Sequence, residues 1–209
     1  MTSDICTIYL LRHGATESNL AQPPRFQGHG INHSLHATGR GQAERTAKYL
    51  ANIPFDAAYS SPLLRARETA EMVLSGRQLG VTPITALEEV HVGRWEGHTW
   101  EEIGKLDPEG YRLHTEDPAK NPYGDGETLY QVQERVTPVF DGLAERHVNQ
   151  QILVVAHTIV NRAFLAGILG MPLTKSRVLG QDNCGVNIVR CHGGEWRLVT
   201  MNDARHLQP

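Results

Sequence analysis

The sequence has few of the features that mark secreted or membrane proteins. It has three cysteines in 209 residues. This odd number without metal-type spacing predicts buried or incidental reduced thiols at Cys6, Cys184 and Cys191. No apolar run is long enough for a transmembrane helix. The residues after Met1 are polar and lack the basic region and apolar core of a signal peptide, so we expect a soluble, cytoplasmic protein.

The sequence also lacks an excess of positive charge. Its formal net charge is −3 at pH 7, with a pI of about 6.4 and no long basic run. This pattern argues against binding to nucleic acid or to an anionic membrane surface. Eleven histidines are unusual, and His29, His33 and His36 are close enough in sequence to raise the question of a metal. Their Gly- and Asn-rich surroundings provide no rigid helix to align ligands, so we expect no metal and no cofactor.

The order of the expected elements predicts an α/β fold. Apolar strand-like runs alternate with segments of helical periodicity. Such alternation favours a three-layer α/β/α sandwich with a mainly parallel sheet, here as a single domain over residues 1–209. The expected strands cover about residues 6–11, 56–60, 81–86 and 151–156, and the expected helices about residues 38–50, 61–75, 127–143 and 159–169.

Local signals refine this prediction. Ser61 followed by Pro62 is typical of an N-cap and a first helical position. Pro138 should bend or interrupt the helix that begins near Glu127. Residues 186–191 and 196–201 alternate around His192-Gly193-Gly194 and predict a β-hairpin at one edge of the sheet.

The segment from about residue 93 to residue 126 differs from the rest of the chain. It is rich in Gly, Pro, Trp and charge, and a capping box from Thr99 to Glu102 indicates one short helix. We interpret it as a cap-like insertion over a site, in which Trp95 and Trp100 serve for packing.

Reactive side chains follow two of the buried strands. His13 comes directly after the first strand, next to Arg12, and His157 comes directly after the strand at residues 151–156. Ligands of open α/β sheets bind at the carboxyl ends of the strands. Arg65 is expected near the start of a helix, and arginines together with helix N-termini suit phosphate. The combination of two histidines and two arginines at one edge of the sheet favours a phosphate pocket. Taken alone, each histidine can simply cap its strand, and Arg65 can simply make a surface ion pair.

Two of these residues also suit covalent chemistry. Neutral histidine is a competent nucleophile, which fits His13. Glu89 lies at the end of the third expected strand, where it can protonate a leaving oxygen and later take a proton from water. Glu88 and Glu96 are other candidate acids.

Several motifs in this order resemble the histidine phosphatase superfamily, which is also called phosphoglycerate mutase-like. The resemblance covers nearly the whole chain and implies that His13 forms a phosphohistidine. It further implies that Arg12, Arg65 and His157 hold the phosphoryl group and that Glu89 is the proton donor. The motifs are Leu11-Arg12-His13-Gly14 with Thr16, Glu17 and Asn19, then Gln27-Gly28, Ser60-Ser61 with Arg65-Ala66 and Thr69-Ala70, Glu89 with Gly93, Trp95-Glu96-Gly97, Gly126-Glu127-Thr128, and Val155-Ala156-His157.

Within the superfamily, the sequence is most similar to the cofactor-independent phosphatases of phosphoserine and α-ribazole phosphate. The similarity implies a metal-independent phosphomonoesterase that acts on a small phosphorylated metabolite and that can form a homodimer. It places Asn19, Gln27, Gly28, His91, Thr158 and His206 on the substrate side.

Two other functions remain open. One is mutase-type phosphoryl transfer, and the other is a non-catalytic module that binds a phospholigand. Mutases of this superfamily usually carry a longer insertion after the acid, whereas here Glu89 runs directly into Gly93. We therefore favour hydrolysis. The loop from Gly28 to Leu35 is one residue longer than the family pattern, and Pro23-Pro24 lengthens the approach to Gln27, so substrate identity stays open.

Overall fold

A computed structural model describes residues 4–208 of the chain. Residues Met1–Ser3, which entered the argument about a signal peptide, lie outside the described part. One six-stranded sheet has the order β3-β2-β4-β1-β5-β6. The first four strands of this order are parallel to one another, and β5 is antiparallel to both of its neighbours, β1 and β6. The strands are β1 (Ile5–Arg12), β2 (Ala57–Ser60), β3 (Val81–Pro83), β4 (Gln151–Ala156), β5 (Val186–His192) and β6 (Glu195–Asp203).

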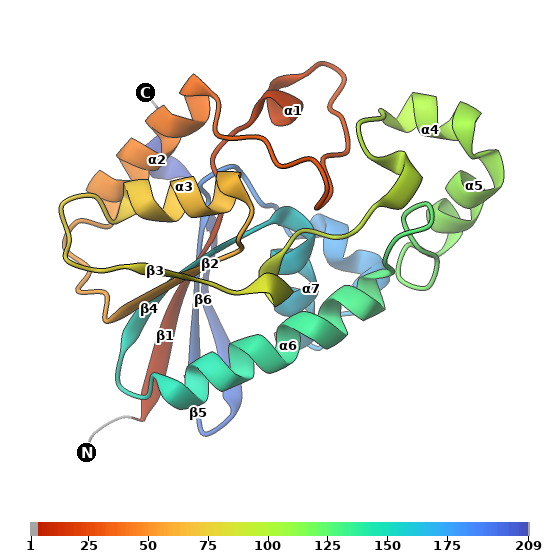
Figure 1. The fold of residues 1–209 in the computed structure, drawn as a ribbon. Helices are drawn as coiled ribbons and strands as arrows, with labels where there is room; N and C mark the ends of the chain where they lie inside the picture. The colour runs from red at the N-terminus through yellow and green to blue at the C-terminus, as the bar shows by residue number, and fades with distance from the viewer. Residues whose placement is uncertain (1–3, 209) are drawn as a thin grey trace.

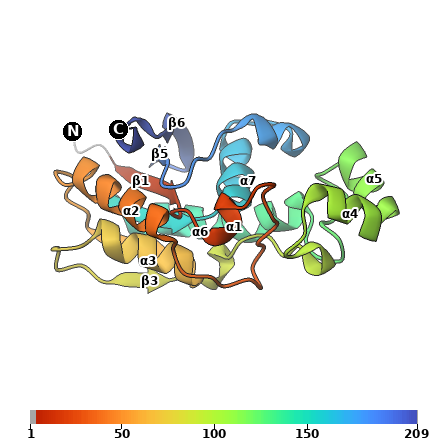
Figure 2. The same ribbon diagram turned by 90° about the horizontal axis from the view of Figure 1, so that it is seen from above.

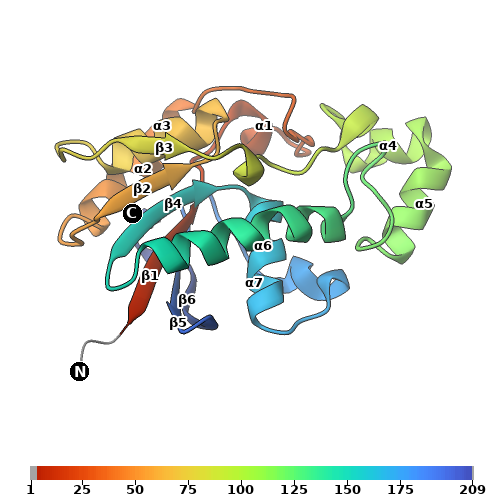
Figure 3. The same cartoon turned by 60° about the horizontal axis from the view of Figure 1, so that its bottom comes forward.

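Helices cover both faces of the sheet. Figure 1 and Figure 3 show α2 and α3 on one face and α6 and α7 on the other. The predicted three-layer α/β sandwich is therefore confirmed. The helices are α1 (Glu17–Leu20), α2 (Ala37–Tyr49), α3 (Leu64–Val73), α4 (Trp100–Leu106), α5 (Pro108–Glu116), α6 (Leu129–Arg146) and α7 (Thr158–Ile168), with 3₁₀ turns η1 (Thr85–Leu87), η2 (Gly93–Trp95), η3 (Leu173–Val178) and η4 (Arg205–Leu207).

The side chains of β1 alternate between the two hydrophobic cores. Ile8 and Leu10 belong to the core under α6 and α7, which includes the stacked rings of Phe140 and Phe164. Tyr9 and Leu11 belong to the core under α3. Successive strand residues point to opposite faces, so a strand buried on both faces must be apolar throughout. This requirement explains the continuous apolar run before Arg12.

Three local predictions were wrong. Helix α3 begins at Leu64, because the Ser61 hydroxyl accepts a hydrogen bond from the Leu63 N–H in a local turn and does not cap the helix. Strand β3 ends at Pro83, because its partner strand β2 ends at Ser60 and the last contact between them is the Ile84 N–H to the Ser60 carbonyl at 2.8 Å. Helix α6 continues through Pro138 to Arg146. Pro138 is exposed, so water can hydrogen-bond the backbone carbonyl that its missing N–H leaves free.

The predicted hairpin is confirmed at the edge of the sheet. Strands β5 and β6 pair in antiparallel fashion from His192 opposite Glu195. The two residues between them, Gly193 and Gly194, have φ values of 56° and 83°. Two positive φ values in a two-residue loop are the requirement of a type I′ hairpin turn, which explains the glycine pair.

The segment predicted as an insertion contains η2, α4 and α5. Figure 2 shows α4 and α5 to one side of the α2 and α3 layer. Trp95 is fully buried there and packs edge-on against Phe26, Trp100 and Tyr123. An aromatic cluster thus connects this segment to the residues that precede Gln27. Within residues 4–208, no helix combines the length and apolar character needed to cross a membrane.

Candidate active site

The register of two parallel strands brings the two strand-end histidines together. Arg12 on β1 pairs with Ala156 on β4, so the next residue of each strand is a histidine. The backbone N–H of His13 donates to the carbonyl of Ala156 at 3.1 Å. The ring centroids of His13 and His157 are 5.1 Å apart, and both side chains are buried. The centre of the site is therefore built by the sheet itself.

Strand β2 places the second arginine at the same edge. Ser60 pairs with Val155 of β4, and the chain then turns into α3. Arg65 is the second residue of α3, and only 1% of its surface is exposed. Its terminal nitrogens donate to the carbonyls of Gly28 at 2.7 Å and Ile31 at 2.9 Å. The guanidinium thus has one fixed orientation and holds the loop that contains Gly28.

Four buried nitrogens at this edge have no hydrogen-bond partner among residues 4–208. They are Nε of Arg12, Nε of Arg65 and both ring nitrogens of His157. Buried polar atoms are normally paired. A phosphoryl group supplies several acceptor oxygens and a negative charge, which suit guanidinium and imidazole N–H donors. The unpaired N–H groups of the two guanidiniums and the one N–H of the His157 ring therefore fit a bound phosphoryl group.

Hydrogen bonding selects one tautomer of His13. Its Nδ1 lies 2.7 Å from the carbonyl oxygen of Gly14. A carbonyl only accepts, so Nδ1 carries the proton and Nε2 keeps a free lone pair. Burial first, then the charges of Arg65 and Arg12, hold the pKa of His13 well below its usual value of 6.5. The ring is therefore neutral at pH 7, as a nucleophile must be.

The same environment sets the charge states of His157, Arg12 and Arg65, which together with His13 form the phosphoryl cradle. Burial, then Arg65, lowers the pKa of His157 well below 6.5, so it is also neutral at pH 7. Burial lowers the pKa of Arg12 and of Arg65 to about 10, with the charge of Glu89 acting in the opposite direction. Both guanidiniums remain protonated at pH 7. The site combines two positive charges with two neutral imidazoles.

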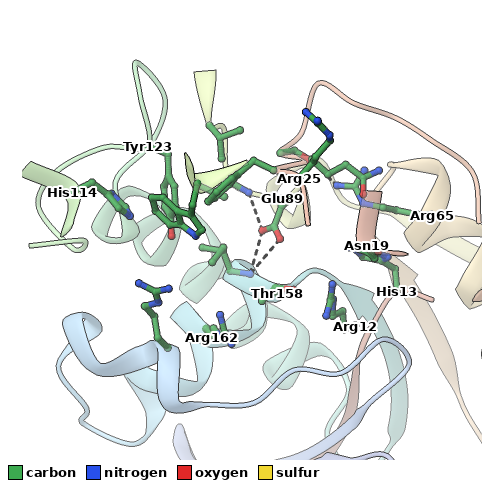
Figure 4. A pocket seen from close by; sticks show the side chains of 18 residues that line it. Arg12, His13, Asn19, Arg25, Arg65, Glu89, His114, Tyr123, Thr158 and Arg162 are labelled. Atoms are coloured by element: carbon green, nitrogen blue, oxygen red, sulfur yellow. Dashed lines mark hydrogen bonds between the residues drawn. The ribbon is translucent and has the colours of Figure 1, made fainter. Parts of the chain in front are cut away.

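Glu89 lies across the cavity from the histidines. Its carboxylate accepts hydrogen bonds from the backbone N–H groups of Val90 at 2.9 Å and of Ile159 at 3.3 Å. Ile159 is in the first turn of α7, which begins directly after His157. Figure 4 shows the carboxylate in the cavity, held by these contacts. The same helix start that follows His157 therefore orients Glu89.

The segment around His13 is supported from two sides. The Gly14 N–H donates to the Thr69 hydroxyl of α3 at 2.9 Å. A Cβ on Gly14 would lie 2.7 Å from the backbone oxygen of Gly39, so only glycine allows this approach of α2. On the other side, the Asn183 side chain donates to the His13 carbonyl at 2.9 Å. These contacts fix the backbone that presents the imidazole.

A cavity of about 250 Å³ opens beside His13. Eight of the residues expected in the site line it, including the predicted acid and four of the predicted substrate contacts. His157 lies behind this lining against His13. The eight are Arg12, His13, Asn19, Gln27, Gly28, Arg65, Glu89 and Thr158.

Asn19 and Gln27 also stabilise the loop that they belong to. The Thr16 hydroxyl donates to the side-chain oxygen of Gln27 at 2.8 Å, and the Thr16 backbone N–H donates to the side-chain oxygen of Asn19 at 3.0 Å. The Gln27 amide donates to the carbonyl of Ile31 at 3.3 Å. Both side-chain oxygens are thus engaged within the protein, and the N–H groups of Asn19 and the second N–H of Gln27 remain for a ligand.

Two expected substrate contacts are absent from the cavity lining. His206 stacks on Tyr49 with ring centroids 4.6 Å apart, and its Nε2 lies 2.9 Å from the Thr46 hydroxyl. It therefore attaches the C-terminal segment to α2. His91 is exposed and packs edge-on against His29, with centroids 4.3 Å apart. The similarity placed both residues on the substrate side, whereas in this structure neither lines the cavity.

Most of the cavity wall on the side away from His13 was not predicted from the sequence. Trp100, which was expected only to pack the insertion, lines it. Arg162 follows Thr158 by four residues on α7, and this helical spacing is the one signal that would have placed it on the same side. The additional lining residues are Arg25, Phe26, Val90, Val92, Trp100, His114, Tyr123, Ile159, Arg162 and Arg177.

The fold and site define a class of α/β proteins with a phosphoryl-binding centre at the carboxyl ends of parallel strands. The chain belongs to the histidine phosphatase superfamily, branch 1, whose family model matches residues 8–204. The resemblance predicted from the motifs is thereby confirmed, and with it the assignment to an enzyme family of phosphatases.

Named relatives agree with this assignment. Phosphoserine phosphatase 1 of Hydrogenobacter thermophilus is 32% identical over 200 residues, which cover 96% of this chain and 93% of the relative. The adenosylcobalamin/α-ribazole phosphatase of Escherichia coli is 34% identical over 165 residues, which cover 79% of this chain and 80% of the relative. The structure of YhfR from Bacillus stearothermophilus has a TM-score of 0.88 and 31% sequence identity, and the match covers 97% of this chain and 100% of YhfR.

Proposed function

We propose that this protein is a phosphomonoesterase that hydrolyses a small phosphorylated metabolite through a phosphohistidine at His13, without a metal ion. The observation that carries the mechanism is the 2.7 Å contact between Nδ1 of His13 and the Gly14 carbonyl. It leaves Nε2 as the free lone pair in a cavity lined by arginines. Membership of the superfamily and the names of the relatives support hydrolysis of phosphate esters.

In the first step, the lone pair on Nε2 of His13 attacks phosphorus and forms a P–N bond. The bond between phosphorus and the ester oxygen breaks, and Glu89 gives its proton to that oxygen, so the leaving group departs as a neutral alcohol. Arg12, Arg65 and His157 stabilise the three non-bridging oxygens as negative charge develops on them. These donors occupy fixed positions before the reaction, which avoids reorganisation during it.

In the second step, the Glu89 carboxylate takes a proton from water. The resulting hydroxide equivalent attacks phosphorus, the P–N bond breaks, and its electron pair returns to Nε2 of His13. Inorganic phosphate leaves, and Glu89 is again protonated. The enzyme therefore returns to its starting state with water as the only co-reactant.

The size and charge of the cavity support the proposed substrate class and metal independence. Its volume of about 250 Å³ is below the roughly 300–1,000 Å³ of pockets for drug-sized ligands, which favours a small metabolite. The guanidiniums of Arg12 and Arg65 supply the positive charge that metal ions provide in many phosphoryl-transfer enzymes. We assign Asn19, Gln27, Gly28 and Thr158 to the substrate side of the cavity.

The test is to trap the covalent intermediate in the presence of a chelator. The enzyme is mixed with p-nitrophenyl phosphate and EDTA, quenched in the millisecond range, and analysed for acid-labile, base-stable protein phosphate. We expect the label on His13 in the wild type, none in His13→Ala, and normal labelling in His192→Ala, a control histidine at an exposed position. Full activity in His13→Ala would disprove the mechanism.

Two further readouts address the other parts of the proposal. Activity that EDTA abolishes and a divalent metal restores would contradict metal independence. Phosphate that passes to an added alcohol and not to water would indicate mutase-type transfer.

A further inference from the structure

The cavity contains a second group of positive side chains, apart from the phosphoryl cradle. Arg162 on α7 and Arg177 on η3 both line the cavity. Figure 4 shows Arg162, together with Tyr123 and His114, on the other side of Glu89 from His13 and Arg12. A ligand whose phosphoryl group lies on His13 would therefore extend past Glu89 toward Arg162.

Contacts within the protein hold both guanidiniums in place without neutralising them. Nε of Arg162 donates to the backbone carbonyl of Leu179 at 2.8 Å. The guanidinium carbon of Arg177 lies 5.9 Å from the ring centroid of Trp100, within the range of a cation–π contact. Among residues 4–208, no carboxylate lies within 4.0 Å of either guanidinium.

A third arginine of the cavity serves as an internal comparison. Arg25 also lines the cavity, but its guanidinium donates to both carboxylate oxygens of Glu102 at 3.0 and 3.2 Å. Its charge is therefore balanced within the protein. Arg162 and Arg177 have no such partner in the described chain, although burial and the neighbouring charge of Arg177 lower the pKa of Arg162. Arg177 is exposed and Arg162 is partly buried, so a ligand anion can reach both guanidiniums and pair with them without breaking an existing ion pair.

The charges of the cavity indicate what such a ligand carries. A phosphate monoester dianion balances the charges of Arg12 and Arg65. Glu89 is the only carboxylate among the lining residues, and it offsets at most one of the charges of Arg162 and Arg177. At least one positive charge therefore remains at the far wall when only a phosphate is bound. A second anionic group on the substrate would neutralise it.

We propose that Arg162 and Arg177 form a second anion subsite, and that the substrate is a phosphomonoester with a carboxylate or a second phosphate at its far end. This inference rests on the proposed function, because it uses the position of the phosphoryl group on His13. Tyr123 and Trp100 form the wall beside the two arginines, so the subsite selects a short charged tail and not a bulky neutral one. The two arginines thereby act as specificity determinants.

The test compares substrates that differ only at the far end. The reference is glycerol 3-phosphate, and the three comparison substrates are 3-phosphoglycerate with a carboxylate, glycerol 1,3-bisphosphate with a second phosphate, and 3-amino-2-hydroxypropyl phosphate with an ammonium group. For the wild type, Arg177→Gln and Arg177→Glu, kcat/KM is measured for each substrate and divided by that of the reference. Lys175→Gln is the matched control, because Lys175 is exposed on the same 3₁₀ turn and does not line the cavity.

We expect the wild type to prefer at least one of the two substrates with a second anionic group, and the preferred substrate identifies that group. Arg177→Gln should reduce that preference by about tenfold, as for the loss of one charged hydrogen-bonding partner. Arg177→Glu should reverse it and favour 3-amino-2-hydroxypropyl phosphate, whose tail is positive. Lys175→Gln should keep the wild-type ratios. Equal ratios in the wild type and both Arg177 variants would overturn the subsite.

The two proposals fail in different ways. A wild type that hydrolyses none of these esters, or a His13→Ala variant that still hydrolyses them, contradicts the proposed function. A wild type that hydrolyses all of them through His13, with ratios that do not depend on Arg177, leaves the phosphatase intact and removes only the second anion subsite.

Discussion

The rings of His13 and His157 lie 5.1 Å apart with an angle of 57° between their planes. They belong to neighbouring parallel strands whose last residues, Arg12 and Ala156, are in register. Neither imidazole carries a charge at pH 7, because burial and the nearby arginines lower both pKa values. One ring is thus placed to attack a phosphoryl group while the other stands beside it as a hydrogen-bond donor.

Replacement of His157 by Ala should slow both chemical steps. The variant loses a donor to the non-bridging oxygens, a type of loss that costs about 10²- to 10³-fold in kcat. Rapid-quench measurements of phosphoenzyme formation and decay on p-nitrophenyl phosphate would separate the two steps. A variant with normal formation and slow decay would show that His157 does not stabilise the first transition state.

Replacement of Glu89 by Gln should affect substrates according to their leaving group. Gln keeps an oxygen that can accept the Ile159 N–H, but it cannot give a proton to the leaving oxygen. For alkyl phosphates the loss should be about 10²- to 10⁴-fold in phosphoenzyme formation. For p-nitrophenyl phosphate it should be much smaller, because p-nitrophenolate departs without a proton. Equal losses for both substrates would argue against Glu89 as the general acid.

Replacement of Arg65 by Lys should weaken both phosphoryl binding and the loop at Gly28. A lysine has one charged nitrogen and cannot reproduce the donors to Gly28, to Ile31 and to a phosphoryl oxygen together. We expect kcat/KM to fall by about 10²-fold or more and amide hydrogen exchange in residues 28–31 to increase. Arg67→Lys is the control, since Arg67 is exposed on the same helix and pairs with Glu71.

The stability of the protein should fall as the pH drops below 6.5. In the unfolded chain His13 and His157 take up protons near pH 6.5, whereas in the folded chain they stay neutral to a much lower pH. The unfolded state then binds more protons, so the free energy of unfolding decreases by about 1.4 kcal/mol per pH unit for each histidine. Between pH 8 and pH 5.5, the decrease in the free energy of unfolding, measured by denaturant, should be about 1.4 kcal/mol smaller in total in His157→Gln. Parallel profiles would contradict this prediction.

Two glycines near the start of α2 should respond to Ala in opposite directions. At Gly14, a Cβ would lie 2.7 Å from the Gly39 oxygen, so Gly14→Ala should destabilise the fold by about 1–3 kcal/mol. At Gly41, inside α2, a Cβ meets nothing within 4 Å, so Gly41→Ala should stabilise it by about 0.5–1 kcal/mol. Thermal unfolding of both variants provides the measurement. A neutral Gly14→Ala would show that α2 can move away from the site.

The sequence predicted the fold class and the centre of the site because the same residues determine both. A strand buried on both faces has to be apolar, so the polar residues Arg12, His13 and His157 could follow only where burial of the strand ends. Parallel strands then bring their carboxyl ends to one edge of the sheet. These steps do not depend on the details of packing.

The sequence did not predict features that depend on competition between contacts. Ser61 and Pro62 fit the rules for a helix start, but the Ser61 hydroxyl bonds the Leu63 N–H and the helix begins later. His206 belongs to a segment that the family motif marks, yet stacking on Tyr49 directs it away from the cavity. Arg177 carries no local signal, because its position depends on how η3 packs against Trp100 from a distant part of the chain.

The pairing of β1 with β4 also has a consequence for folding. These strands are roughly 140 positions apart in the chain, and such non-local pairing is slow because the intervening loop must first be closed. The two histidines are brought together only when both strands are present and paired. During refolding, phosphatase activity should therefore return only with this pairing, and later than the signal of the helices, whose contacts are mostly local.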